Sequence, residues 1–170
     1  MIELEVYSVL YSLLSRHRVV LLKELSGERF LPIWIGQHES EAIAMRLQGA
    51  SVPRPMTHDL LNSAIGELGG VLQYILVNDL SNGTFYAQLA VEQNGQMRMI
   101  DSRPSDAIAL AVRAQVTIYS EDEVLDKAGI LPSPDIRPAH EEGADLDVFR
   151  EFIENLDIDD EDAEDAESSE

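Results

Sequence analysis

A repeat within the sequence restricts the fold more than any other feature. The segment 40–45 (Ser-Glu-Ala-Ile-Ala-Met) recurs as 105–110 (Ser-Asp-Ala-Ile-Ala-Leu). The same offset in numbering aligns three earlier apolar segments with three later ones: Val6–Leu10 with Val71–Ile75, Val19–Leu22 with Thr84–Ala87, and Ile33–Ile35 with Arg98–Ile100. Chance similarity between two alanine-rich helix starts would not extend to three strands. We therefore predict two halves, each strand-strand-strand-helix, related by a pseudo-twofold axis.

The hydrophobic pattern predicts the elements of each half. Alternating or continuous apolar runs predict strands over residues 3–10, 18–25, 30–35, 71–78, 84–92, 96–100 and 117–120. Apolar stripes at helical spacing predict helices over residues 38–47, 57–68, 104–114 and 121–128. The helix at 57–68 is then an insertion between the halves. We predict an α+β domain with duplicated halves and an inserted helix.

The edges of the predicted sheet need protection. Pro32 has no N–H to donate to a neighbouring strand, so we expect its strand at an edge. We also expect the short strand 117–120 at an edge, which it would protect poorly. Because exposed edges of stable proteins are covered or paired, we expect a homodimer.

Charge is concentrated at the C-terminal end of the chain. The formal net charge of the 170 residues is −20. Residues 135–170 hold 16 acidic and 2 basic side chains, or −14, which leaves 16 acidic and 10 basic side chains, or −6, in residues 1–134. No basic stripe that would bind nucleic acid by charge alone is present. Nucleic-acid chemistry would therefore need a local arginine cluster, a bound cation, or both.

The charge distribution predicts a domain at 1–130 and an acidic, largely disordered tail at 131–170. Four large apolar residues of the tail recur at helical spacing: Leu146, Phe149, Ile153 and Leu156. This spacing favours a short amphipathic helix over residues 145–156, which would dock on the domain or bind a protein partner.

The N-terminus and the absence of cysteine bear on location. In residues 1–5 acidic and apolar side chains alternate, which is unlike a signal peptide. No apolar run is long enough to span a membrane. With no cysteine, the chain has neither a disulfide framework nor a thiolate metal site. We expect a cytoplasmic protein.

Three polar clusters lie where a strand or loop enters a helix: 37–41, Arg54 with 57–59, and 101–106. Helix starts and arginine bind phosphate, while carboxylates can hold Mg²⁺ or Mn²⁺ and activate water. The candidate phosphate-binding residues are Arg54, Arg103 and Ser105. The candidate catalytic residues are His58, Asp59, Asp101 and Asp106, and the candidate metal ligands are Glu39, Glu41 and Asp101.

Each cluster also has a purely structural interpretation. Helix capping alone would explain Thr57 and Ser105, and the helix dipole would explain Glu41 and Asp106 in first turns. Asp101 and Arg103 would pair with each other or across the halves. A local hydrogen bond is at least as good an explanation of His58 as catalysis.

Four groups of residues, in this order, resemble those of a known family. They are Leu31–Gly36 with Glu39 and Glu41–Ala44, Pro53–Pro55 with Thr57–Leu61, Asp79–Leu80 with Thr84–Ala87, and Ile100–Leu110. Together they are similar to the bifunctional nuclease family over roughly residues 1–130. The resemblance implies an α+β fold and activity on both DNA and RNA, and the candidate residues above rest on their sequence positions alone.

We therefore predict a nuclease that hydrolyses phosphodiester bonds in DNA and RNA with the help of Mg²⁺ or Mn²⁺. Two alternatives stay open. One is a non-catalytic dimeric docking module whose acidic tail engages a partner, and the other is a sensor of a small ligand or anion that uses the same helix starts.

The acidic tail generates the first testable prediction. It lacks the apolar surface to offset an ordering cost of about 1–2 kcal/mol per residue, and its carboxylates compete with nucleic acid for Arg54 and Arg103. Deleting residues 135–170 should leave the melting temperature almost unchanged and tighten nucleic-acid binding, by a factor that shrinks as salt rises. A large loss of stability, or unchanged affinity, would contradict this.

Overall fold

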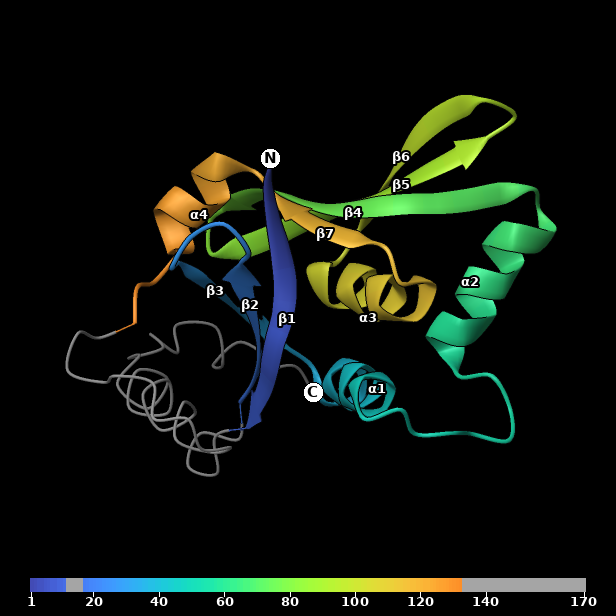
Figure 1. The fold of residues 1–170 in the computed structure, drawn as a ribbon, viewed down its shortest axis with the longest axis horizontal. Helices are drawn as coiled ribbons and strands as arrows, with labels where there is room; N and C mark the ends of the chain where they lie inside the picture. Colours follow the sequence, from blue (N-terminus) through green and yellow to red (C-terminus); the bar gives the residue numbers. More distant parts are fainter. Residues whose placement is uncertain (12–16, 133–170) are drawn as a thin grey trace, which may run out of the picture.

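The computed structural model describes residues 1–11 and 17–132. The expected amphipathic helix and acidic tail lie outside the described residues, apart from Leu131 and Pro132. Along the chain the elements are β1 (Ile2–Tyr11), β2 (Arg18–Glu24), β3 (Phe30–Ile35), α1 (Gln37–Leu47), α2 (Thr57–Glu67), β4 (Gly70–Ser81), β5 (Thr84–Gln93), β6 (Gln96–Ser102), α3 (Pro104–Ala114), β7 (Thr117–Ser120) and α4 (Asp122–Ala128) (Figure 1). None of these helices is long and apolar enough to cross a membrane.

The strands form one sheet in the order β3-β2-β1-β7-β4-β5-β6. Each half contributes an antiparallel three-stranded meander, and β7 joins the two. Because β7 is antiparallel to β1 and parallel to β4, β1 and β4 run in opposite directions, as a twofold relation requires. The predicted α+β fold with duplicated strand-strand-strand-helix halves and an inserted helix is confirmed.

The edges of the sheet are β3 and β6. Pro32 therefore lies in an edge strand, as its missing N–H predicts. The expectation that residues 117–120 form a poorly protected edge strand is wrong, since β7 is the central strand. Its short length reflects its role as a connector between two meanders, with Ile118 and Ser120 buried.

The repeat offset holds for the third strand and the helix of each half but not for the second strand. Arg18 pairs with Ile35, and Leu89 pairs with Ile100, the residue that the repeat aligns with Ile35. Leu89 therefore occupies the place in the sheet that Arg18 has in the first half, whereas the repeat offset would align Arg18 with Gly83. The alignment of Val19–Leu22 with Thr84–Ala87 is displaced along the strand.

Different turns explain the displacement. The hairpins of the second half close with two-residue turns, Asn82-Gly83 and Asn94-Gly95, in which all four residues have positive φ. This is the conformation that tight hairpins need and that asparagine and glycine adopt readily. The connections of the first half, 12–17 and 25–29, are longer.

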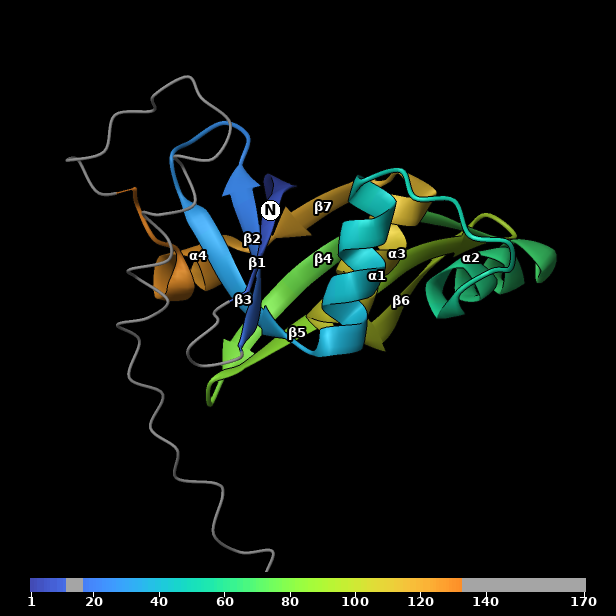
Figure 2. The ribbon, with the colours of Figure 1, turned by 90° about the horizontal axis from the view of Figure 1, so that it is seen from below.

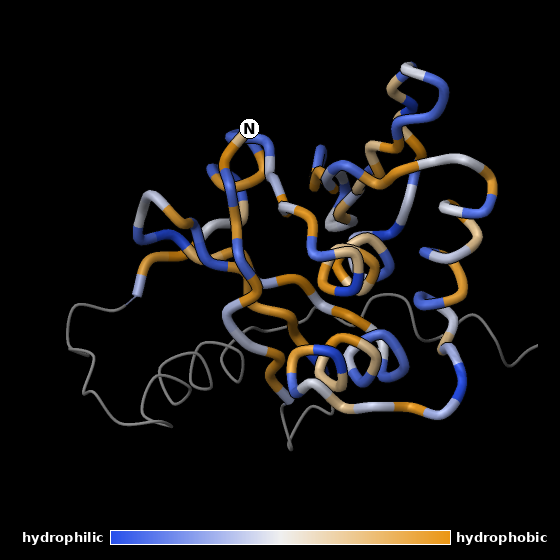
Figure 3. Tube along the Cα trace, turned by 45° about the vertical axis from the view of Figure 1, so that its right-hand side comes forward, coloured by the Kyte–Doolittle hydropathy of each residue, from blue (hydrophilic) through white to orange (hydrophobic). Residues whose placement is uncertain are grey.

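Helix α3 lies at the centre of the core. Every side chain from Ala107 to Ala111 has no exposed surface. Figures 1 and 2 show α3 between the sheet and α1, with α2 at one end of the sheet. Apolar positions of α3 and of the strands around it are orange in Figure 3. The small alanine side chains let the neighbouring elements approach the helix closely.

Arg113 joins three helices. Its side chain is 5% exposed, and Nε donates to Asp59 Oδ1 at 2.8 Å. Its two terminal nitrogens donate to the carbonyl oxygens of Ala109 at 2.8 Å and Ala42 at 3.1 Å. Asp59 Oδ2 accepts from the Met56 N–H at 2.9 Å, which stabilises the first turn of α2. One buried guanidinium thus fixes α1, α2 and α3 relative to one another.

Removal of this guanidinium should destabilise the domain. Arg113→Ala removes a buried cation and its side-chain bonds to two carbonyls and to the Asp59 carboxylate, so the free energy of unfolding should fall by about 3 kcal/mol. Arg46→Ala is the matched control, because Arg46 is exposed and makes one hydrogen bond, to the Val112 carbonyl. It should change stability by about 0.5 kcal/mol or less. Urea unfolding measures the free energy of unfolding of both variants. Equal small decreases would show that Arg113 does not hold the three helices together.

Candidate active site

The first turns of α1, α2 and α3 meet in a continuous network of side chains. His58 Nε2 lies 3.1 Å from Asp106 Oδ1. Arg103 Nε donates to Asp106 Oδ2 at 2.8 Å, and Arg103 NH2 donates to Glu39 Oε1 at 2.8 Å. Four of the candidate residues are thus joined, which we call the His58 network: His58, Asp106, Arg103 and Glu39.

Burial differs along the His58 network. The His58 side chain is 10% exposed and that of Glu39 is 16% exposed, whereas Arg103 is 68% exposed. The other Glu39 oxygen lies against Gly36, so a Cβ at that position would displace the Glu39 carboxylate. Asp106 and then Glu39 raise the pKa of the Arg103 guanidinium by hydrogen bonding and charge. The network therefore presents one firmly held cation to solvent.

Arg103 lines a cavity of about 710 Å³. Three segments distant in sequence form it: residues 33–36 at the end of β3, residues 83–85 where the β4–β5 turn enters β5, and residues 103–105 at the start of α3. His17 completes the wall. We call it the Trp34 cavity after its largest aromatic side chain.

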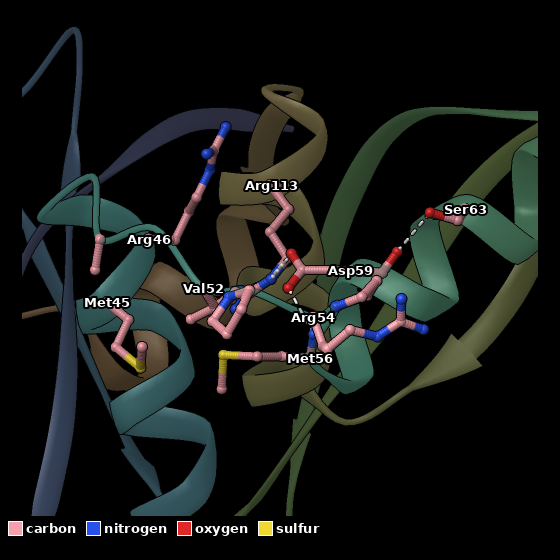
Figure 4. A pocket seen from close by; sticks show the side chains of 11 residues that line it. Met45, Arg46, Val52, Arg54, Met56, Asp59, Ser63 and Arg113 are labelled. Carbon is pink, nitrogen blue, oxygen red and sulfur yellow. Dashed lines mark hydrogen bonds and ion pairs between the residues drawn. The ribbon is translucent and has the colours of Figure 1, made fainter.

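Arg54 lines a different pocket, of about 310 Å³, together with Asp59, Arg46 and Arg113. In Figure 4 the Arg54 and Arg46 guanidinium groups point in different directions, and Asp59 is bonded to Arg113. Arg54 itself makes no ion pair with a described residue. The two arginines predicted to bind phosphate, Arg54 and Arg103, therefore line separate pockets.

The remaining candidates lie apart from the His58 network. Asp101 is exposed on β6 and forms no ion pair with a described residue. Glu41 accepts a hydrogen bond from Gln37 at 2.9 Å and lies 3.8 Å from Arg18. Ser105 is buried at the rim of the Trp34 cavity.

The capping roles predicted for two residues are wrong. Thr57 and Ser105 lie inside their helices, whose N-cap residues are Met56 and Arg103. At the start of α2 a different polar side chain makes the capping contact, since the carboxylate of Asp59 accepts a hydrogen bond from the Met56 N–H.

The carboxylates of the described residues do not gather into a group that could hold an ion. Within residues 1–11 and 17–132, no three acidic or histidine side chains lie close enough to hold an ion. Glu39 and Asp106 both face Arg103, which occupies the place a cation would take between them. Glu39, Glu41 and Asp101 are not gathered into one group of the described residues, and their role as metal ligands stays a prediction.

Sequence reasoning missed three residues that line the site. His17, Trp34 and Phe85 contribute to the Trp34 cavity, and none lies in a polar cluster at a helix start. The available signal was a single tryptophan in an apolar edge strand, where an exposed aromatic side chain would have indicated a binding surface.

The chain is similar to proteins from bacteria and plants. A family model described as the bifunctional nuclease domain matches residues 20–133. Two uncharacterized proteins of Mycobacterium tuberculosis are each 43% identical over 146 residues, covering 84% of this chain and 87% of their own. Bifunctional nuclease 1 of Oryza sativa subsp. japonica is 25% identical over 117 residues, 67% of this chain and 35% of that protein. Bifunctional nuclease 1 of Arabidopsis thaliana is 24% identical over 129 residues, 69% of this chain and 40% of that protein.

The plant proteins are thus matched over less than half of their length. The family match, by contrast, runs from within β2 past the end of α4 and includes every residue of the His58 network. On the strength of that match, this chain belongs to the bifunctional nuclease domain family.

Proposed function

We propose that this chain is a nuclease that hydrolyses phosphodiester bonds in DNA and RNA, and that the reaction takes place beside His58 and Asp106. The family and the names of the plant relatives favour this class of reaction. The observation that carries the proposal is the His58 network, which places an acid–base group and an exposed guanidinium on the same carboxylate.

His58 is suited to move the proton. When Nε2–H is donated to Asp106, the lone pair of Nδ1 is left to accept a proton, and Asp106 stabilises the imidazolium that forms. The oxygen of an attacking water would then bond to phosphorus while its proton goes to Nδ1. The same proton is returned to the leaving oxygen as the P–O bond breaks.

Arg103 is suited to stabilise the charge on the phosphoryl oxygens. Two of its nitrogens are held by Asp106 and Glu39, and NH1 makes no hydrogen bond to a described residue. A guanidinium held in place by two carboxylates requires little reorganisation in the transition state. Ser105, at the start of the same helix, lies where its backbone N–H can assist.

Asp59 and Arg54 have supporting roles in this proposal. Both oxygens of Asp59 are engaged, by Arg113 and by the Met56 N–H, so we assign it to the positioning of α2. The pocket that Arg54 lines holds two further arginines and one carboxylate, which favours a flanking phosphate of the strand. The divalent metal expected from the sequence stays a prediction, and no step is routed through it.

Replacement of His58 tests the chemistry. His58→Gln keeps a side-chain amide near Asp106 but cannot accept a proton, so cleavage should fall about 100-fold or more while the melting temperature changes little. His38→Gln is the matched control, since His38 is exposed on α1. Cleavage of single- and double-stranded DNA and RNA is measured with Mg²⁺, Mn²⁺ or EDTA. Absence of cleavage in every arm, or unchanged cleavage by His58→Gln, would refute the proposal.

We also propose that the chain forms a homodimer through β6. This edge strand is exposed from Gln96 to Asp101, and Met97, Met99 and Ile100 are each more than two fifths exposed. An edge strand can pair antiparallel with its own copy about a twofold axis perpendicular to the sheet. Such pairing would cover these apolar side chains and give the backbone N–H and C=O groups of the edge hydrogen-bond partners. The same surface would serve the docking module considered as the alternative function.

A charged residue in β6 should prevent this association. Met99→Lys places an ammonium group at the centre of the proposed interface and should give a monomer by light scattering at micromolar concentration, where the unmodified chain is a dimer. Leu25→Lys is the control, because Leu25 is similarly exposed but lies at the β2–β3 turn, away from β6. A monomeric unmodified chain would overturn the dimer.

A further inference from the structure

Trp34 is an exposed aromatic residue in a buried strand. The four preceding residues of β3, Phe30 to Ile33, are all buried, whereas Trp34 is 39% exposed and lines the Trp34 cavity. Phe85, near the start of β5, lines the same cavity. Trp34 and Phe85 thus give the cavity an aromatic wall.

The cavity combines aromatic groups with one cationic rim. Its volume of about 710 Å³ lies in the range of sites that hold a small organic group and far exceeds the space a phosphate needs. Arg103 lies at the rim with NH1 available, and the first N–H groups of α3, those of Ser105 and Asp106, have no partner within the helix. An aromatic wall next to an anion-binding rim matches the two parts of a nucleotide, its base and its phosphate.

The charges around Arg103 indicate whether the aromatic wall or the rim contributes more to nucleotide binding. The Arg103 charge is offset by Glu39 and Asp106, so the rim attracts a phosphate only weakly. Stacking of a base on an aromatic side chain does not depend on charge and is tolerant of sequence. The base must be unpaired to enter, because bases in a duplex are already stacked on each other.

We propose that the Trp34 cavity binds one nucleotide of a single-stranded nucleic acid, with the base stacked on Trp34 and its phosphate at Arg103. This inference rests on the proposed function, since it names the form of substrate that the nuclease takes. Single-stranded DNA and RNA, and unpaired ends, are then bound in preference to duplexes.

The single tryptophan makes the proposal directly measurable. The full chain is titrated with a short oligothymidylate while its tryptophan fluorescence is recorded, for the unmodified chain and for His58→Gln, which binds without cleavage. The single strand should quench the fluorescence, whereas a duplex of the same length and a strand of equal charge with abasic sites should not. Equal quenching by the abasic strand or by the duplex would overturn the proposal.

Affinity gives a second measurement. Trp34→Ala should weaken binding of a labelled single strand, followed by fluorescence anisotropy, about tenfold or more, and Trp34→Phe should restore most of it. Tyr86→Ala is the matched control, because Tyr86 is similarly exposed on β5 but does not line the cavity. Equal effects of Trp34→Ala and Tyr86→Ala would also overturn the proposal.

The two proposals fail separately. Base-dependent quenching without cleavage in any arm would leave the nucleotide site in place and remove the nuclease. Cleavage that is lost in His58→Gln, together with no quenching by any strand, would leave the nuclease in place and remove the nucleotide site.

Discussion

The burial of Arg113 among three helices is the constraint on which the site depends. Its charge lies beneath α1 and α2 and is satisfied by Asp59 and by two backbone carbonyls. This pairing fixes the rotation of α2 about its axis, since Asp59 must face Arg113. His58, the preceding residue, is then directed toward Asp106 at the other end of α3. A structural ion pair therefore sets the orientation of the proposed catalytic histidine.

The duplication explains where the site lies. Glu41 and Asp106 are equivalent positions of the two repeats, yet their partners differ. Glu41 contacts Gln37 and lies near Arg18, both from its own half. Asp106 contacts His58, which belongs to the inserted helix α2. The inserted helix thus breaks the symmetry of the fold, and the repeated helix start that it contacts is the one with potential chemistry.

The sequence predicted the elements well because their signals are local. Hydrophobic periodicity and turn residues define each strand and helix, and Pro32 places β3 at an edge through its missing N–H. The central position of β7 was not predictable in this way, since a short strand between two meanders carries no signal of its neighbours. Sequence position likewise could not separate Arg54 from Arg103. Both lie close to a helix start, and only the packing of α2 against α3 directs them to different pockets.

In the proposed nuclease, different residues would provide substrate affinity and catalytic rate. Residues 1–134 carry a net charge of −6, so long-range attraction of nucleic acid is weak. Arg103, already paired with Asp106 and Glu39, adds little to the binding of a ground-state phosphate. As negative charge grows on the phosphoryl oxygens during attack, the same guanidinium interacts with it more strongly. An interaction that strengthens in the transition state accelerates the reaction, whereas one of equal strength in both states does not. Affinity would then come from the stacked base, and rate from the His58 network.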